Sequence, residues 1–363
     1  MKIITGNLNR RSTLKLFSAG AATLFTPAIV RHSRAQDMTL NVGDSGGNYL
    51  TSFQEAFYTP YEQETGIKVV PIVRRNNPAA DFKAQVESNT YTWDLSSAIT
   101  NDTAALLADA DLLEPLNLSE AATSAVPDDM KTEFYIGNSV ISFVMAYRTD
   151  KYPNGLEGFA DIWALDKVPG RRSLRTLARD TVEVVLRADG VQGGKAIYEV
   201  LSSPDGWDRV YKKLDEIKHD IAVWYNQSVE ATNLLQSGDV DMIPCYSNRA
   251  QVAIDAGLPV GYTWNQGFYS LEGWCIPKGS PKADMARKFI EFCLQPERQA
   301  VAAALLGNGP TIQDAYKFID PARAKTLATF PENFGTQAAL DPVFWAREGS
   351  AANQRFQEWL VAG

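Results

Sequence analysis

The stretch SFQEAFYTPYEQETGIKVVPIV (Ser52–Val73) predicts a helix that leads directly into a strand. Phe53, Phe57 and Tyr61 recur every four residues, which places them on one face of a helix. Gly66 then ends that helix, and the run IKVVPIV is rich in the β-branched residues that favour strands. A helix followed by an apolar strand is the repeating unit of α/β folds, so this stretch indicates the fold class.

The same alternation continues on both sides of this stretch. The pattern predicts further strands and helices at 38–42, 82–87, 93–99 and 104–110. Strands separated by single helices indicate a parallel sheet with helices on both faces. A second series of strands and helices begins near Tyr147, with no Gly/Ser-rich linker before it. Ligands of such sheets bind beyond the carboxyl ends of strands, here the segments 45–49 and 100–102.

Residues 1–35 have the pattern of an export signal. Arg10 and Arg11 precede a short apolar run from Leu16 to Val30, and 33–35 supplies the small residues of a cleavage site. The run is shorter than the roughly 20 apolar residues of a membrane span. The arginine pair is typical of a twin-arginine signal, and a general secretory signal is the alternative. We expect this segment to be removed after export.

Charge and length narrow the class of protein. Removing residues 1–35 takes away six cations and no acids, which lowers the formal net charge from −8 to −14 over the remaining 328 of 363 residues. A chain this acidic does not favour nucleic acid or an anionic membrane surface. No other segment is long and apolar enough to span a membrane, and the length predicts two domains.

Residues with catalytic or metal-binding chemistry are scarce. The two histidines are His32, inside the export signal, and His219, so a His-based triad or metal site is not expected. Cys245, Cys275 and Cys293 have no zinc spacing, and Cys245–Cys275 is the pair expected if a disulfide forms. Cys293 lies in a helical pattern and is expected to be a buried thiol. The sequence also lacks a P-loop, a dinucleotide fingerprint and a nucleophile elbow, so it indicates neither an enzyme nor a cofactor.

The segment QGFYSLEGW (266–274) predicts a strand with an acid among aromatic residues. In a two-residue period Glu272 shares one face with Phe268, Ser270 and Trp274. An unpaired charge in such a place is unfavourable. The residues leave two interpretations open: Glu272 meets the cation of a ligand, or it is a structural carboxylate paired with backbone donors or an arginine.

Several short motifs follow one another in an order and spacing that resemble one family. They are PYEQETGIKV (60–69), WDL (93–95), LLEPL (112–116), GFADIWAL (158–165), LLQSGDVDM (234–242), GWCIPKGSPKADMARKFIEFCLQPERQ (273–299), NGPT (308–311) and RFQEWL (355–360). With them the chain resembles the periplasmic solute-binding proteins of ABC importers, and within these the spermidine/putrescine-binding branch.

The resemblance implies an architecture and a role. It implies two α/β lobes, each a mixed or parallel sheet flanked by helices, joined by crossing strands. The N-lobe would comprise 36–146 plus 271–316, and the C-lobe 147–270 plus 317–363. The protein would be a monomeric, non-enzymatic binding protein of the periplasm, without cofactor or metal. Its lobes would close on a ligand, and the closed form would dock on an inner-membrane permease driven by a separate ATPase.

The resemblance also implies binding residues. In polyamine binders an acid at the position of Glu272 pairs with a ligand amine inside a box of aromatic rings. The other expected ligand-binding residues, matched to the family or adjacent to matched strands, are Ser45, Tyr49, Thr100, Asn101, Asp180, Trp224, Asn226, Tyr246, Arg249 and Trp345. Packing within a lobe is an equal alternative for Tyr49, Trp224 and Trp345, and turn formation is the alternative for Asn226.

The chain departs from the polyamine pattern at several matched positions. Ser45 stands in place of a tryptophan, Leu177 in place of a second acid, and Asn308 in place of a tyrosine. Nearby, Arg175, Arg179 and Arg249 carry planar guanidinium groups that suit a carboxylate, and the alternative for each is a surface or lobe-bridging salt pair.

These departures leave the ligand class open. A polyamine leads on the resemblance alone, and the alternative is a small zwitterion such as γ-aminobutyrate or another ω-amino or guanidino acid. Ferric-ion binding is more distant, because the chain has no Tyr-Tyr pair. A hydrolase that uses Asp180 and Glu272 as paired carboxylates is equally distant.

Overall fold

The computed structural model describes residues 39–362 except residue 76. The predicted export signal at 1–35 therefore lies outside the described residues. Within the described part, no helix is both long and apolar enough to cross a membrane.

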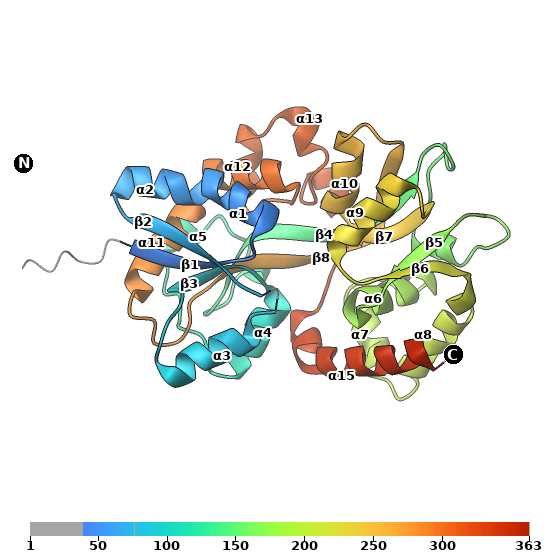
Figure 1. Ribbon diagram of the computed structural model, residues 1–363, viewed down its shortest axis with the longest axis horizontal. Coiled ribbons are helices and arrows are strands. Elements are labelled where there is room, and N and C mark those ends of the chain that lie inside the picture. Colours follow the sequence, from blue (N-terminus) through green and yellow to red (C-terminus); the bar gives the residue numbers. More distant parts are fainter. Residues whose placement is uncertain (1–38, 76, 363) are drawn as a thin grey trace, which may run out of the picture. The chain divides into compact units, whose positions relative to one another are not determined.

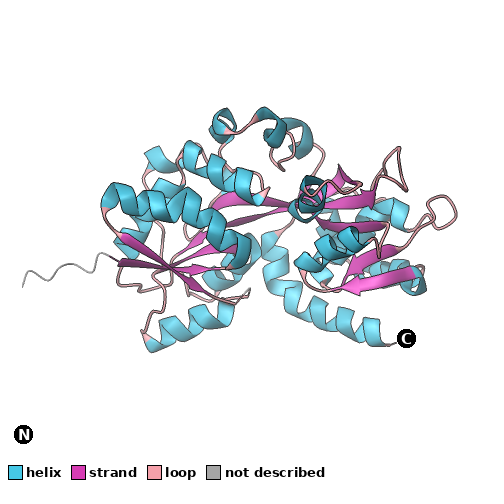
Figure 2. Ribbon diagram, turned by 45° about the horizontal axis from the view of Figure 1, so that its top comes forward, coloured by secondary structure: helices cyan, strands magenta, loops and turns pink. Residues whose placement is uncertain are grey.

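In the described part of the chain, nine strands form a single sheet with helices on both of its faces (Figures 1 and 2). The strands are β1 (Thr39–Asp44), β2 (Lys68–Val73), β3 (Leu95–Thr100), β4 (Ile136–Arg148), β5 (Arg172–Arg175), β6 (Ile221–Tyr225), β7 (Met242–Tyr246), β8 (Val260–Cys275) and β9 (Ala338–Ala339). Their order is β2-β1-β3-β8-β4-β7-β5-β6, and β9 pairs with β8.

The sheet is mixed rather than parallel throughout. β1 is parallel to β2 and β3, and β5 is parallel to β6 and β7, as the strand–helix alternation predicts. The long strands β4 and β8 lie between these two sets and are antiparallel to each other. β8 is also antiparallel to β3, and β4 to β7. The alternation could not show this arrangement, because it depends on how strands far apart in the chain pair.

The α-helices that cover the sheet are α1 (Gly47–Phe53), α2 (Thr59–Thr65), α3 (Ala79–Ser88), α4 (Asn101–Asp109), α5 (Glu120–Thr123), α6 (Ala178–Ala188), α7 (Lys195–Leu201), α8 (Gly206–Asp215), α9 (Ser228–Ser237), α10 (Ser247–Asp255), α11 (Ala283–Cys293), α12 (Pro296–Leu306), α13 (Pro321–Ala324), α14 (Pro331–Phe334) and α15 (Pro342–Val361). Short 3₁₀ turns lie at Asp128–Met130, Phe159–Ile162, Lys218–Asp220 and Gln313–Phe318.

The helix predicted between the first two strands is present, with a π-helical turn at Gln54–Tyr58 between α1 and α2. This turn holds more residues than an α-turn, and both Phe57 and Tyr58 are buried. Gly66 ends α2 in the left-handed conformation, with φ of 74° and its N–H donating to the carbonyl of Glu62 at 2.9 Å. A side chain is disfavoured in that conformation, which is why glycine stands there.

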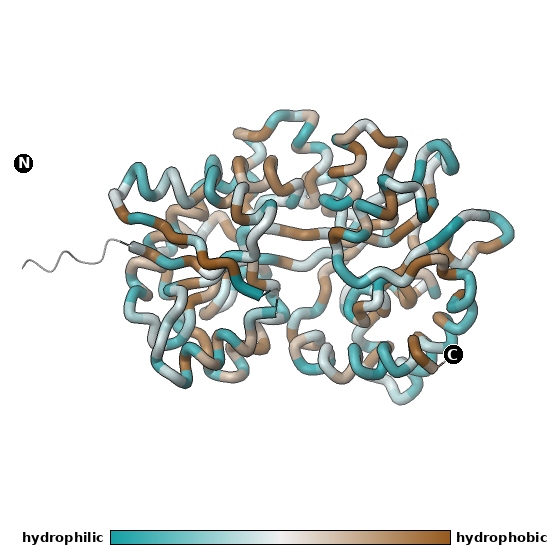
Figure 3. The backbone as a smooth tube through the Cα atoms, viewed as in Figure 1, coloured by the Kyte–Doolittle hydropathy of each residue, from teal (hydrophilic) through white to brown (hydrophobic). Residues whose placement is uncertain are grey.

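Two main hydrophobic cores define two lobes, and apolar segments run along the central strands (Figure 3). In the first core, Trp274 packs against the rings of Phe53, Phe57 and Phe289. The second core surrounds α6 and includes the stacked rings of Phe143 and Phe268, with centroids 5.1 Å apart.

β4 and β8 contribute to both cores. Val140 and Leu271 belong to the first core, whereas Phe143 and Phe268 belong to the second. The protein is therefore a two-lobed α/β fold whose lobes are joined by crossing strands, as the resemblance implied.

All three cysteines are buried free thiols. Cys245 packs beneath α9 and α10, whereas Cys275 and Cys293 belong to the core around Trp274. The Cys245–Cys275 disulfide considered from the sequence is not formed, because the two thiols lie in different cores.

A cleft between the two lobes as the candidate functional site

A cavity of about 720 Å³ lies between the lobes, within the size range of small-molecule sites. It is lined by segments that directly follow strands β1, β3, β6 and β7, namely 45–49, 100–103, 226–229 and 246–249. The cavity thus lies beyond the carboxyl ends of strands, where ligands of α/β sheets bind.

Most of the residues expected to bind ligand line this cleft. They are Ser45, Tyr49, Thr100, Asn226, Tyr246, Arg249, Glu272 and Trp345. The three expected residues that do not line it are Asn101, Asp180 and Trp224.

Asn101 and Trp224 are turned away from the cleft by their local structure. Asn101 is the first residue of α4, and the helical turn brings Asp102 to the cleft in its place. The Trp224 ring packs against Phe356 and Trp359 of α15, with centroids 6.2 and 5.8 Å away. Trp224 therefore anchors the C-terminal helix.

Glu272 lies in the middle of the sheet and reaches the cleft. On β8 it pairs with Thr100 of β3 on one side and Ser139 of β4 on the other. The Tyr49 hydroxyl donates a short hydrogen bond to its carboxylate. Burial raises the pKa of Glu272 to about 7, although the hydrogen bond from Tyr49 and the charge of nearby Arg249 act in the opposite direction.

A chain of amides holds the Tyr49 hydroxyl in place. Asn308 donates to the Tyr49 hydroxyl at 3.3 Å and to the Ser139 hydroxyl at 3.0 Å. The Asn308 carbonyl accepts from Asn248 of α10 at 3.0 Å. The residue that stands in place of the family's tyrosine thus orients a phenol that contacts Glu272.

Asp180 is fully buried beneath two arginines. Arg175 donates to one of its carboxylate oxygens, and Arg179 donates to the other at 3.3 Å. Arg179 also donates to the Tyr246 hydroxyl at 2.9 Å and to Asp102 at 3.0 Å. Because α4 belongs to the first core and α6 to the second, the Arg179–Asp102 ion pair joins the lobes across the cleft.

Arg249 differs from these two arginines. Among the described residues, its guanidinium has no hydrogen-bond or ion-pair partner, and its Nε atom is buried. Of the charged side chains that line the cleft within the described part of the chain, Arg249 and Glu272 are the two without an oppositely charged partner in an ion pair.

Five helices in the described part of the chain begin at the cleft. The residues that precede the first turns of α1, α4, α6, α9 and α10 all line it, and none of them caps its helix with a side chain. The positive ends of these helix dipoles therefore lie at the cleft, which favours an anionic group there.

The sequence did not single out several cleft residues, among them Asn248, Gly349 and Asn353. A signal for the last two was present, because Trp345, Gly349 and Asn353 are four residues apart, the spacing that places residues on one face of a helix. Asp102 lies in the segment 100–102 that was expected at the cleft, although Thr100 and Asn101 were chosen there as the binding residues.

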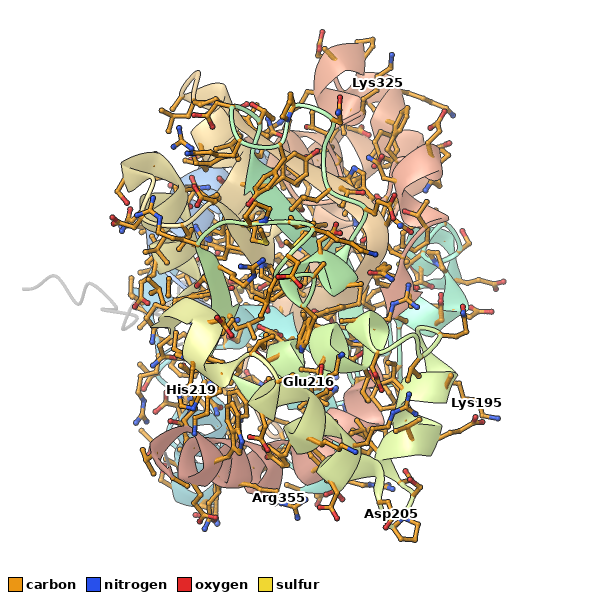
Figure 4. The ribbon with its side chains drawn as sticks, turned by 90° about the vertical axis from the view of Figure 1, so that its right-hand side faces the viewer. Lys195, Asp205, Glu216, His219, Lys325 and Arg355 are labelled. Atoms are coloured by element: carbon orange, nitrogen blue, oxygen red, sulfur yellow. The ribbon has the colours of Figure 1, made fainter. Side chains whose placement is uncertain are left out.

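In the described part of the chain, no group of three or more His, Cys, Asp or Glu side chains is placed to hold a metal ion. His219 is exposed at the surface (Figure 4) and is not among the residues that line the cleft.

With this geometry established, comparison with known proteins identifies the family. The family model of a bacterial extracellular solute-binding protein matches residues 56–331. The chain belongs to this family. This solute-binding protein is 31% identical, over 344 residues, to the Gamma-aminobutyric acid-binding protein of Pseudomonas aeruginosa, a match that covers 93% of this chain and 96% of that relative.

Solved structures agree with this assignment. The GABA receptor Atu4243 has a TM-score of 0.78 and 26% identity, with 90% of this chain and 98% of that chain covered. The spermidine/putrescine substrate-binding protein PotD of Streptococcus pneumoniae has a TM-score of 0.70 at 17% identity, with 89% and 99% covered, which shows a shared fold. The solute-binding protein is thus the substrate-binding subunit of an ABC importer and not an enzyme, which sets aside the hydrolase alternative.

Proposed function

We propose that this solute-binding protein captures a small ω-amino acid, with γ-aminobutyrate as the leading candidate, and presents it to an ABC permease of the inner membrane. We further propose that it does so in the periplasm, after export. The observation that carries the proposal is the pair of charges left without ion-pair partners in the cleft, Glu272 and Arg249.

The two charges complement the two ends of a zwitterion. Glu272, with the Tyr49 hydroxyl beside it, suits an ammonium group. Arg249 suits a carboxylate, and the helix N-termini around the cleft add positive potential for the same group. The names of two relatives, one a γ-aminobutyrate-binding protein and one a GABA receptor, support this ligand class.

A polyamine fits these charges less well, although it led on the sequence. A diamine needs a carboxylate at each end, and the second acid expected from the sequence, Asp180, is already neutralised by Arg175 and Arg179. An unpaired Arg249 would also repel a second ammonium group. We therefore place the zwitterion ahead of the polyamine.

Isothermal titration of the purified protein with γ-aminobutyrate, putrescine and spermidine tests the proposal. We expect saturable binding of γ-aminobutyrate and an affinity for the polyamines at least about 100-fold lower. Tighter binding of a polyamine would reject the zwitterion.

The Arg249→Gln variant tests the carboxylate end. We expect the affinity for γ-aminobutyrate to fall more than about tenfold, because the ligand carboxylate loses its charge partner. Arg347→Gln, an exposed position on α15 outside the cleft, is the matched control. Equal effects of the two substitutions would show that Arg249 does not contact the ligand.

A further inference from the structure

The C-terminal helix forms a wall of the cleft that the charged pair does not use. Trp345, Gly349 and Asn353 lie one turn apart on α15, and all three line the cavity. Arg249 lies in the first turn of α10, and α10 is well separated from α15 in Figure 1. The lining of the cleft therefore includes the charged Arg249 on α10 and, on α15, a wall of uncharged residues.

Hydrogen bonds to α6 fix both ends of this wall. The Trp345 indole N–H donates to Glu183 at 3.4 Å. The Asn353 carbonyl oxygen accepts from the Ala178 backbone N–H at 2.9 Å, which fixes the orientation of the amide. The amide nitrogen of Asn353 has no partner in the described part of the chain and remains available as a donor.

Gly349, between these two ends, has no role in packing or in the backbone. It lies inside a helix of 20 residues, where alanine would form helix better. A Cβ atom at this position would have no heavy atom within 4 Å, and the backbone is not in the left-handed region. Neither a close neighbour nor an unusual φ requires glycine at this position. What the missing side chain does is leave open space in the cleft next to Gly349.

We propose that Gly349 is a specificity-determining position, which keeps open a subsite for an uncharged, hydroxylated extension of the bound zwitterion. The extension would lie over Gly349, between the Trp345 ring and the Asn353 side chain. The amide N–H groups of Asn353 would donate to a hydroxyl oxygen of the extension. Asn226 and Ser228 also line the cleft and add neutral hydrogen-bonding groups. The inference rests on the proposed function, in that the charged pair holds the zwitterionic part.

Three probes test the subsite: γ-aminobutyrate and its two dihydroxypropyl derivatives, one substituted on the nitrogen and one on carbon 2. The isomers place the same extension at either end of the zwitterion. We expect at least one derivative to bind the wild-type protein as tightly as γ-aminobutyrate or more tightly. Binding of both derivatives more than about tenfold weaker than γ-aminobutyrate would overturn the subsite and leave the proposed function intact.

The remaining outcomes separate the two proposals. Binding of a derivative without binding of γ-aminobutyrate would retain the subsite and reject the unsubstituted ω-amino acid as the ligand. Failure of all three probes to bind would reject both.

Substitution at Gly349 tests the position itself. We expect Gly349→Leu to weaken the extended probe at least about tenfold and γ-aminobutyrate less than about threefold. Ser350→Leu, at the next and exposed position of the same helix, should change neither. Equal losses for both probes in Gly349→Leu would assign the glycine to lobe closure and contradict the proposal.

Two milder variants complete the test. Gly349→Ala should raise the melting temperature of the ligand-free protein by about 1–3 °C, because nothing opposes the added methyl group. Asn353→Asp keeps the acceptor for the Ala178 N–H and removes the amide donor. It should weaken the extended probe alone, and an unchanged affinity would exclude Asn353 from the subsite.

Discussion

Glu272 is a carboxylate whose charge depends on what lies beside it. Burial raises its pKa to about 7, against the opposing effects of the Tyr49 hydrogen bond and the charges of Arg74 and Arg249. An ammonium group in the cleft would stabilise the charged form and lower that pKa. Binding of a cationic group should therefore release a proton near neutral pH.

The affinity for γ-aminobutyrate should accordingly rise about tenfold between pH 6 and pH 8, because a protonated Glu272 must first lose its proton. The charges of an ω-amino acid do not titrate in this interval, so the change would belong to the protein. Titration calorimetry in buffers of different ionisation enthalpy measures both the affinity and the protons released.

Glu272→Gln provides the comparison for this prediction. Its affinity should be lower by more than about tenfold at pH 8 and nearly independent of pH. A wild-type affinity that does not change with pH would mean that Glu272 stays charged, or stays neutral, throughout.

At the scale of elements, α6 and α15 share a second buried acid. Glu183 of α6 accepts hydrogen bonds from Tyr198 of α7 at 2.5 Å and from Trp345 of α15 at 3.4 Å. Burial raises the pKa of Glu183 to about 7, and the charges nearest to it are Asp180 and Arg187 on its own helix. Its proton is therefore held more tightly in the folded protein than in the unfolded chain.

This shift predicts a loss of stability with rising pH. The contribution of Glu183 is fully present below its unfolded pKa, near 4.5, and is lost as the pH rises through about 7. In Glu183→Gln, the decrease in unfolding free energy between pH 5.5 and pH 8 should be smaller by about 2 kcal/mol than in the wild type. Denaturant unfolding at both pH values measures it, and the exposed Glu216→Gln is the control. Parallel pH profiles for wild type and Glu183→Gln would contradict the prediction.

Elements with strong periodicity could be predicted from the sequence, and pairings between distant segments could not. The helix through Phe53 and Phe57 and the strand that contains Glu272 follow from local patterns, and both are present. The π-turn at Gln54–Tyr58 depends on packing against the first core, which no four-residue spacing reveals. The antiparallel insertion of β8 depends on its partners β3 and β4.

The same limit applies to the candidate site. The loops after β1 and β3 could be placed at the cleft, because strand ends in α/β sheets meet there, and Asn226 and Tyr246 were expected there from the adjacent strand and from the resemblance. The state of Asp180 could not be predicted, since it depends on how Arg175 and Arg179 fold back onto it. Because of these two ion pairs, Asp180, the second acid expected of a polyamine site, is buried and neutralised by arginines.

At the scale of the whole molecule, the two lobes are tied across the cleft by the ion pair of Arg179 and Asp102 at 3.0 Å. The pair is mostly shielded, with side-chain exposures of 13% and 20%, so it should contribute more than a surface pair. This ion pair can form only when the two lobes are close together across the cleft. It should therefore slow the release of a ligand that is bound between them.

Asp102→Asn should therefore raise the dissociation rate of the ligand about two- to fivefold, with little change in the association rate. Because a zwitterion has no net charge, removing the Asp102 charge should attract one end of the ligand about as much as it repels the other. The association rate should therefore change little. Stopped-flow kinetics measures both rates, and Asp109→Asn at the exposed end of α4 is the matched control. A change confined to the association rate would show that Asp102 steers the ligand and does not retain it.

The crossing strands give the molecule a mechanical property. β4 and β8 pair from Ile136–Trp274 in one lobe to Arg148–Val260 in the other, with a register shift at Gly137/Ser139 and an interruption between Phe143–Phe268 and Met145–Thr263, where residues 264–267 of β8 have no partner on β4. A rotation of one lobe relative to the other would twist this pair of strands. The strands should bend most easily at the register shift and at the interruption. Twisting the paired strands costs more energy as the angle between the lobes grows. The stiffness of β4 and β8 should therefore help to set how far the lobes open.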